Sequence, residues 1–185
     1  MNPGAHRDGG AARQVVGHER PSAPAPRFRP FEPDDLPTLQ EIRKAAFAPV
    51  FRSFVAIVGE AIAAVAFARA DAEQAKLLDD ICRAGSGHQV LVATLGEAIV
   101  GFVSFTIDAD KRLGEIGLNA VHPAHAGKGL GTRMYEHALA LMKEHGAAVA
   151  TVGTGGDPSH APARRAYARA GFAVGIPSVT LYKLL

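Results

Sequence analysis

Three glycines at alternate positions mark the segment of this chain that is best suited to hold a ligand. They are Gly127, Gly129 and Gly131, and a segment with helical spacing follows them directly. Glycine has no side chain, so the backbone can approach a ligand closely. The helix would point unpaired N–H groups and the positive end of its dipole at the same place. The pattern predicts a phosphate or pyrophosphate site, and a glycine-rich turn without a ligand is the alternative.

Two better-known phosphate loops do not fit this segment. A Walker loop has a glycine five residues before its Gly-Lys pair and Ser or Thr directly after it, but His122 and Gly129 stand there. The dinucleotide fingerprint needs a third glycine where Thr132 stands, and it belongs near the first strand of a parallel unit. Both are therefore excluded.

A carboxylate precedes the glycines, within the predicted strand at residues 113–121. Strand alternation would set Glu115, Gly117 and Asn119 on one face and Ile116, Leu118 and Ala120 on the other. A glutamate among small residues is a poor choice for a core, so a functional role is one interpretation of it. A solvated strand face or a structural ion pair is the alternative.

The chain resembles the GNAT superfamily of N-acetyltransferases in two places. The family's loop is Gln or Arg, two residues, Gly, one residue, then Gly or Ala; here Ala126, Gly129 and Gly131 occupy these places. The family's later pattern is Asn, two residues, Ala, three residues, Tyr, three residues, Gly-Phe, and residues 160–172 follow it except for His160 in place of Asn. The resemblance covers roughly Arg27 to the end of the chain and is specific from Glu115 to Phe172.

The resemblance implies that acetyl-CoA is the co-substrate and an amine the acceptor. Backbone N–H groups near Asn119 to Val121 would hold the carbonyl oxygen as negative charge develops on it. The expected acetyl-CoA contacts are Asn119, Ala120, Val121, Ala126, Gly127, Lys128, Gly129, Leu130, Gly131, Thr132 and His160.

Two residues carry the catalytic roles that the resemblance implies. An alkyl amine has a pKa near 10 and must lose a proton before it can attack a thioester. The resemblance assigns the base to Glu115, acting directly or through water, while His122, His125 and His160 are other proton acceptors. It assigns the return of a proton to the departing thiolate to Tyr167, for which a buried core aromatic is the alternative.

The elements that must position these residues alternate between helical and strand patterns. Strands are predicted at residues 27–31, 88–94, 98–107, 113–121, 148–152, 172–174 and 179–183, with a hairpin turn at 95–97. The first helix is predicted from the turn at 33–35 to about residue 47, with Asp34 or Asp35 as its cap. Two more helices are predicted between 49 and 84, with a break near 69–71. The last two are predicted at 129–145 and 159–170. This order predicts an α/β chain with a mixed, mostly antiparallel central sheet flanked by helices, the GNAT fold.

Length and composition bound the remaining possibilities. The 185 residues predict one domain at 27–185 after a flexible Gly-, Ala- and Pro-rich tail at 1–26. Twenty basic and eighteen acidic residues without charge runs give no nucleic-acid footprint, and the apolar run at 54–67 is too short to cross a membrane. The single Cys82 suits a packed thiol in the reducing cytoplasm, and no histidine spacing predicts a metal site.

The sequence therefore predicts an acetyl-CoA-dependent N-acetyltransferase that acts by direct transfer in a ternary complex. The acceptor pocket is expected between Leu36 and Ala84, where no signature identifies the amine, and a homodimer stays open. A non-catalytic acyl-CoA sensor or assembly module is the alternative, because Ala126 and His160 depart from the family pattern.

Overall fold

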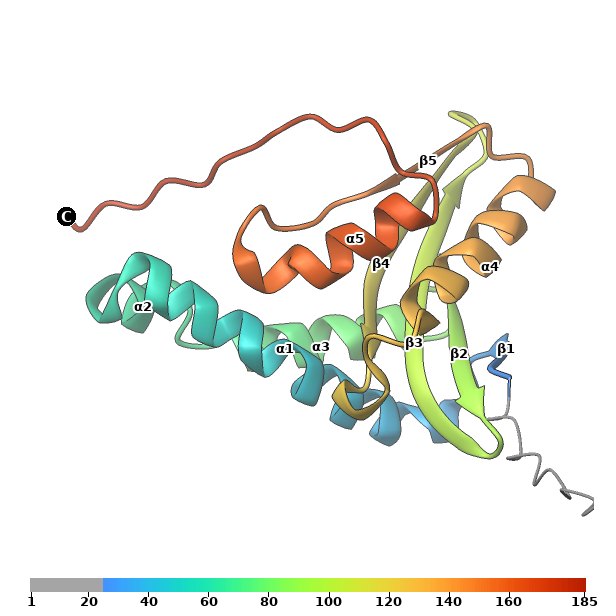
Figure 1. Ribbon diagram of the computed structural model, residues 1–185, viewed down its shortest axis with the longest axis horizontal. Coiled ribbons are helices and arrows are strands. Elements are labelled where there is room, and N and C mark those ends of the chain that lie inside the picture. Colours follow the sequence, from blue (N-terminus) through green and yellow to red (C-terminus); the bar gives the residue numbers. More distant parts are fainter. Residues whose placement is uncertain (1–24) are drawn as a thin grey trace, which may run out of the picture.

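A five-stranded sheet forms the centre of the protein, as the computed structural model shows for residues 25–185 (Figure 1). The strand order is β1-β2-β3-β4-β5, and all neighbours are antiparallel except β4 and β5, which are parallel. The strands are β1 (Arg27–Pro30), β2 (Gln89–Leu95), β3 (Ala98–Asp108), β4 (Leu113–Val121) and β5 (Val149–Val152). The predicted mixed, mostly antiparallel sheet is confirmed. The predicted tail at 1–26 lies outside the described residues except for its last two.

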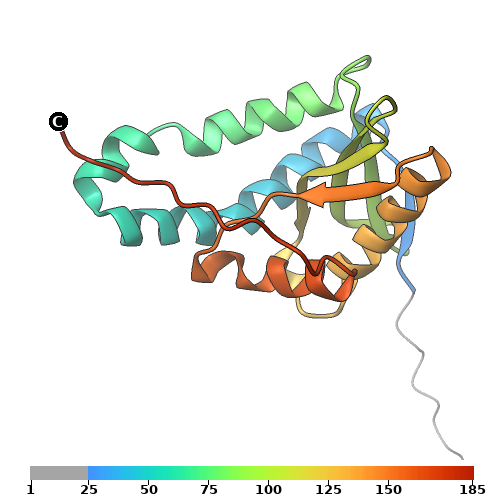
Figure 2. The ribbon, with the colours of Figure 1, turned by 90° about the horizontal axis from the view of Figure 1, so that it is seen from above.

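Helices cover both faces of the sheet (Figure 2). One layer contains α1 (Leu36–Val58), α2 (Glu60–Ala66) and α3 (Ala70–Cys82), and the other contains α4 (Leu130–Glu144) and α5 (Ala161–Arg169). Short 3-10 helices at Pro33–Asp35, Pro123–His125 and Pro158–His160 precede α1, the glycine turn and α5. The helices thus form two layers around one sheet.

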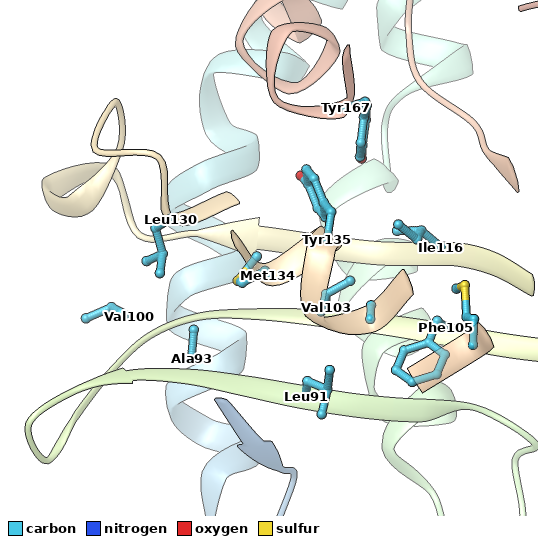
Figure 3. Packing of buried hydrophobic residues seen from close by; sticks show 12 residues of the cluster. Leu91, Ala93, Val100, Val103, Phe105, Ile116, Leu130, Met134, Tyr135 and Tyr167 are labelled. Carbon is cyan, nitrogen blue, oxygen red and sulfur yellow. The ribbon is translucent and has the colours of Figure 1, made fainter. Parts of the chain in front are cut away.

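Each helical layer has its own apolar core against the sheet. Leu39 of α1 and Leu78 of α3 pack with Phe102 of β3, and all three are fully buried. On the opposite face the predicted stripe of α4 packs against β3 and β4 (Figure 3). Its buried members are Leu130, Met134, Ala138 and Met142. Burying four such side chains at about 1.5–3 kcal/mol for each large one anchors α4, and with it the glycine turn, to the sheet.

The first helix is longer than predicted and is not capped as predicted. It runs through Pro49 to Val58 and ends at Gly59, whose φ of 81° is in the left-handed region that glycine adopts readily. Pro49 lies inside the helix, where proline usually breaks the backbone ladder. Asp35 does not cap α1; its carboxylate accepts bonds from the guanidinium of Arg29 and the backbone N–H of Glu32. The aspartate therefore ties β1 to the start of α1.

The two closing strands predicted at 172–174 and 179–183 are wrong, because the chain has no strand after β5 among residues 25–185. Both views show the segment after α5 running away from the sheet toward α2, where the Tyr182 ring meets Phe67 at 5.7 Å (Figures 1 and 2). Alternating apolar residues suit any extended chain, and only pairing makes such a segment a strand. Pro177 has no N–H to donate to a neighbouring strand, so it interrupts pairing in this segment.

Cys82 ends α3 half-buried against the α1/α3 core. Burial raises the pKa of its thiol to about 11, and the nearby Asp79 and Asp35 carboxylates add to this effect. The thiol therefore stays protonated near neutral pH, as expected of a packed cysteine.

Candidate functional site

The parallel strands β4 and β5 separate partway along β4. Their pairing begins at Leu113↔Val149 and ends at Ile116↔Val152. Beyond this point β4 continues to Val121, paired with β3 only, while the chain after β5 continues through residues 153–156 without strand structure. The edge of β4 from Gly117 to Val121 therefore has no strand partner on its β5 side. We call this region the opening between β4 and β5.

A β-bulge lies in β4 at the start of the opening. Ser104 of β3 stands opposite two residues, Gly117 and Leu118, because the register moves from Ile116↔Phe105 to Asn119↔Val103. The Ser104 hydroxyl donates to the Leu118 carbonyl at 2.9 Å. A Cβ at residue 117 would stand 2.8 Å from that hydroxyl oxygen, so the bulge requires glycine there.

The bulge changes which side chains share a face, so the alternation expected for β4 is wrong. Ile116 packs in the α4 core, whereas Leu118 and Ala120 pack in the α1/α3 core. Asn119 lies on the α4 face, where its side chain bonds to residues of α4 and α5. Glu115 alternates with Ile116 and thus lies on the α1/α3 face, exposed and opposite Asn119. The structure therefore does not bring Glu115 and Asn119 together.

Two tyrosines, Tyr135 and Tyr167, whose rings are drawn in Figure 3, bond to Asn119 beside the opening. The Tyr135 hydroxyl donates to Asn119 Oδ1 at 2.8 Å, and Asn119 Nδ2 donates to the Tyr167 hydroxyl at 3.0 Å and to the Gly117 carbonyl. The tyrosine rings are 4.5 Å apart and nearly fully buried. Burial, with a smaller effect from Tyr167, raises the pKa of Tyr135 above its ordinary value, so it stays protonated. The Tyr135 hydroxyl therefore donates within this network, and the Tyr167 hydroxyl accepts from Asn119.

The glycine turn has an open backbone at the N-terminus of α4. Gly127 and Gly129 have φ of 76° and 77°, and a Cβ at either would meet nothing within 4 Å. Gly129 is the N-cap of α4, and no side chain caps this helix end. The first N–H groups of α4 are therefore available to a ligand with negative charge.

A buried hydroxyl at the turn fits the pyrophosphate expected there. Thr132 is the third residue of α4, and its Oγ1 is buried without a hydrogen-bond partner among the described residues; His125 Nδ1 is in the same state. Buried polar groups usually have a partner, and a phosphate oxygen is one that a threonine hydroxyl can bind. Lys128 Nζ lies 3.2 Å from the Ala124 carbonyl oxygen, and its charge remains exposed. The turn thus fits the group that the sequence predicts for it.

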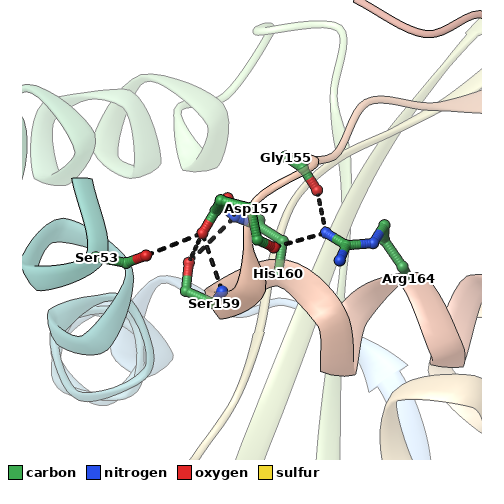
Figure 4. Close-up of polar contacts among 6 residues, drawn as sticks. All are labelled: Ser53, Gly155, Asp157, Ser159, His160 and Arg164. Carbon is green, nitrogen blue, oxygen red and sulfur yellow. Dashed lines mark hydrogen bonds and ion pairs between the residues drawn. The ribbon is translucent and has the colours of Figure 1, made fainter. Parts of the chain in front are cut away.

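Sequence reasoning missed a polar cluster at the N-terminus of α5 (Figure 4). Asp157 is its centre: one carboxylate oxygen accepts from the backbone N–H and hydroxyl of Ser159 and from the hydroxyl of Ser53 in α1, the last at 3.1 Å. The other oxygen lies 2.5 Å from His160 Nδ1. Burial opposes ionisation, but these bonds from Ser159 and His160 outweigh it and lower the pKa of Asp157 well below its ordinary value.

The predicted site residues fall into two groups around the opening. The backbone of Asn119–Val121, the turn at 126–132 and Tyr167 lie at the opening or on its α4 side. His160, predicted as a cofactor contact, is the N-cap of α5 and stacks on Phe54 of α1 at 5.9 Å between ring centroids. Among residues 25–185 no cluster of three or more His, Cys, Asp or Glu could hold a metal, and no helix is long and apolar enough to cross a membrane.

The chain matches one protein family and shares its fold with many solved structures. The model of the acetyltransferase (GNAT) family matches residues 60–172, more than half of the chain. No curated protein matches the sequence. Among solved structures, the PaiA N-acetyltransferase from Thermoplasma acidophilum in complex with coenzyme A is 20% identical, with a TM-score of 0.64 over 83% of this chain and 93% of that one.

Two further structures share the fold. A GNAT family acetyltransferase from Brucella melitensis in complex with acetyl-CoA is 21% identical, with a TM-score of 0.53 over 71% of this chain and 78% of that one. The ribosomal-protein-S18-alanine N-acetyltransferase from Escherichia coli is 17% identical, with a TM-score of 0.60 over 82% and 80% of the two chains. At these identities the likeness concerns the fold.

Proposed function

Because the chain belongs to the acetyltransferase (GNAT) family, we propose that it transfers the acetyl group of acetyl-CoA to an amine by direct attack in a ternary complex. The observation that carries this proposal is the opening between β4 and β5, which has a glycine turn at one end and the Tyr167 hydroxyl beside it. A bound thioester would supply the activated acyl group; the residues of this chain would bind it, orient it and move protons.

The glycine turn is proposed to hold the pyrophosphate. The open N–H groups at the start of α4 and the unpartnered Thr132 hydroxyl can donate to phosphate oxygens. Ala126 has no side chain to add where the family has Gln or Arg, so the backbone must carry the interaction. The buried stripe of α4 fixes this turn relative to β4, which favours a preorganised site.

The free edge of β4 is proposed to bind the reacting carbonyl. Backbone N–H groups from Asn119 to Val121 that point into the opening could donate to the oxygen as it gains negative charge. In other enzymes one such donor contributes on the order of 3 kcal/mol to the transition state. The bulge matters here because it turns the strand edge just before these residues.

Tyr167 is proposed to return a proton to the departing thiolate. Its hydroxyl accepts from Asn119, and a phenol that accepts one bond still has its own O–H to donate. The ring is held by Tyr135 at 4.5 Å and by Phe172 at 6.0 Å between centroids. A fixed hydroxyl beside the opening supports this role, which needs a donor held within hydrogen-bond reach of the departing sulfur.

The acceptor amine needs a group that takes its proton, and two residues can do so. Glu115, expected from the resemblance, lies exposed on the α1/α3 face near the start of the opening and bonds to no side chain among the described residues. His160 lies at the other end of the region, between α1 and α5, and is held by Asp157. The two differ in how well their side chains are positioned.

The experiment for this proposal is thiol release from acetyl-CoA with and without amines. A suitable panel contains small primary amines, a polyamine, an aminoglycoside and a peptide with a free N-terminus. We expect release that depends on one class of amine and saturates with both substrates. Tight acetyl-CoA binding in calorimetry without release by any amine would instead indicate an acyl-CoA sensor or assembly module.

A further inference from the structure

We propose that His160, held by Asp157, is the group that accepts the proton of the attacking amine. This inference rests on the proposed acetyl transfer and assigns one role within it. The sequence names His160 both as a contact to the cofactor, in place of the usual asparagine, and among several other proton acceptors; the structure adds the pairing with Asp157, which favours the second role.

Asp157 fixes which nitrogen of His160 is available. The Asp157 carboxylate lies 2.5 Å from Nδ1, so Nδ1 carries the proton of the neutral imidazole and Nε2 is left as the acceptor. The same carboxylate accepts from Ser159 and from Ser53, which hold it in place from both sides.

The backbone around the pair is shaped to fit it. A Cβ at Gly155 would stand 2.5 Å from His160 Nδ1 and 2.6 Å from Asp157 Oδ1, so only glycine leaves room for the pair as it stands. Arg164 ties the loop further by donating to the Asp157 carbonyl at 2.8 Å and to that of Gly155. The pair is therefore part of a fixed loop that follows β5 directly.

The position of His160 suits an amine that enters from the α1 side. Its ring stacks on Phe54 of α1, while its own helix α5 presents Tyr167 to the opening. His160 ends the 3-10 helix that leads into α5, and Tyr167 lies seven residues further along the same continuous segment. The imidazole keeps 18% of its surface exposed, so a ligand can reach it.

The protons balance in this scheme. The ammonium group gives one proton to His160 Nε2, which later passes it to solvent. The neutral nitrogen then forms the C–N bond as the C–S bond breaks, and Tyr167 gives its proton to the thiolate. The second proton that the nitrogen loses returns to Tyr167 through solvent. In sum, an ammonium ion and a thioester yield an amide, a thiol and one proton.

The test compares the pH profiles of kcat/KM for the wild type and variants with an amine from the panel that the wild type acetylates. Without its base, His160→Asn should act only on amine that is already neutral. We therefore expect its rate near neutral pH to fall about 100- to 10,000-fold and its acid limb to move toward the amine's own pKa near 10. Acetyl-CoA affinity should change little. His160→Gln gives the same comparison if the asparagine variant does not fold.

Asp157→Asn tests the positioning role. The variant lacks the negative charge beside the imidazole, so the acid limb of its kcat/KM profile should move to lower pH while the rate falls. Arg164 of α5 carries a charge and donates to the Asp157 carbonyl, and α1 contributes the uncharged Ser53 and Phe54 beside the pair. A residue with a merely structural role would change the rate without moving the limb.

His145→Asn is the matched control, because this histidine also bonds through Nδ1, to the Leu141 carbonyl at the far end of α4, and it should behave as the wild type. If Glu115→Gln moves the acid limb toward the amine pKa and His160→Asn does not, Glu115 is the base and the inference is overturned. A wild type that acetylates no amine overturns the proposed function itself.

Discussion

Replacing Tyr167 by phenylalanine separates its chemical role from its packing role. The change removes one oxygen and keeps a ring whose centroid lies 4.5 Å from that of Tyr135. Tyr167 is only 6% exposed. The lost hydroxyl accepts a bond of 3.0 Å from Asn119 Nδ2, and this amide group keeps its second bond, to the Gly117 carbonyl. The variant should therefore fold.

The expected size of both effects follows from these contacts. One N–H of Asn119 loses its partner, which costs about 1 kcal/mol in the free energy of unfolding and lowers the melting temperature by roughly 2–4 °C in a domain of this size. The acetylation rate should fall about 10- to 1,000-fold if Tyr167 supplies the thiolate proton, within or just below the usual range for one acid–base group. Acetyl-CoA affinity should hold.

Tyr135→Phe is the control, since its hydroxyl bonds to the same asparagine, through Oδ1 at 2.8 Å. Its stability loss should be similar, but its proton is already used within the network, so its rate should stay within a few-fold of the wild type. The measurement is single-turnover thiol release, where product release does not limit the rate. Wild-type turnover in Tyr167→Phe, or equal losses in both variants, would leave Tyr167 as a core aromatic only.

Three further changes test other parts of the account. Gly129→Val places a β-branched residue at a φ of 77°, where its Cβ meets nothing within 4 Å but the backbone is strained, so the protein should fold with reduced stability and lose acetyl-CoA binding in calorimetry; unchanged affinity would move the site elsewhere. Thr132→Val removes a buried hydroxyl without a partner, so thermal unfolding should show equal or higher stability while acetyl-CoA affinity falls, and unchanged affinity would leave the hydroxyl without a role. The hydrogen bonds from Arg29 lower the pKa of Asp35, so urea unfolding should show that Asp35→Asn costs stability at pH 7 and progressively less as pH falls below 3.8; an equal cost at pH 7 and pH 2 would contradict this.

The sequence predicts the frame of the site well, because its signals are local. The hairpin of β2 and β3, the strand β4 and the helix α4 each follow from periodicity within a short window, and their bounds agree with the structure within one or two residues. The glycine turn is predicted for the same reason, since its conformation depends on residues that are adjacent in the chain.

The faces of β4 could not be predicted in this way. Simple alternation places Glu115 with Asn119, but the bulge opposite Ser104 separates them. A bulge depends on the register with a neighbouring strand, which periodicity within one strand does not report. Gly117 was the available signal, because a glycine within a strand often marks a bulge or a close backbone contact.

The polar cluster around Asp157 was missed because its members come from two parts of the chain. Ser53 lies in α1, more than one hundred residues before Asp157. The local part was visible: Asp157, Pro158 and Ser159 form an N-terminal helix signal, and His160 follows at a spacing of three. The strands predicted at 172–174 and 179–183 are absent because an apolar pattern is local, whereas strand pairing depends on a neighbour that is distant in the sequence.

The most direct test of the central claim follows the acetyl group itself. Isotopically labelled acetyl-CoA is mixed with the protein, first alone and then with a reactive amine, and both protein and amine are analysed by mass spectrometry. Direct transfer predicts label on the amine as an amide, one thiol released for each amide formed, and no label on the protein when the amine is left out. Label that accumulates on the protein, or binding without any labelled amine, would contradict the account.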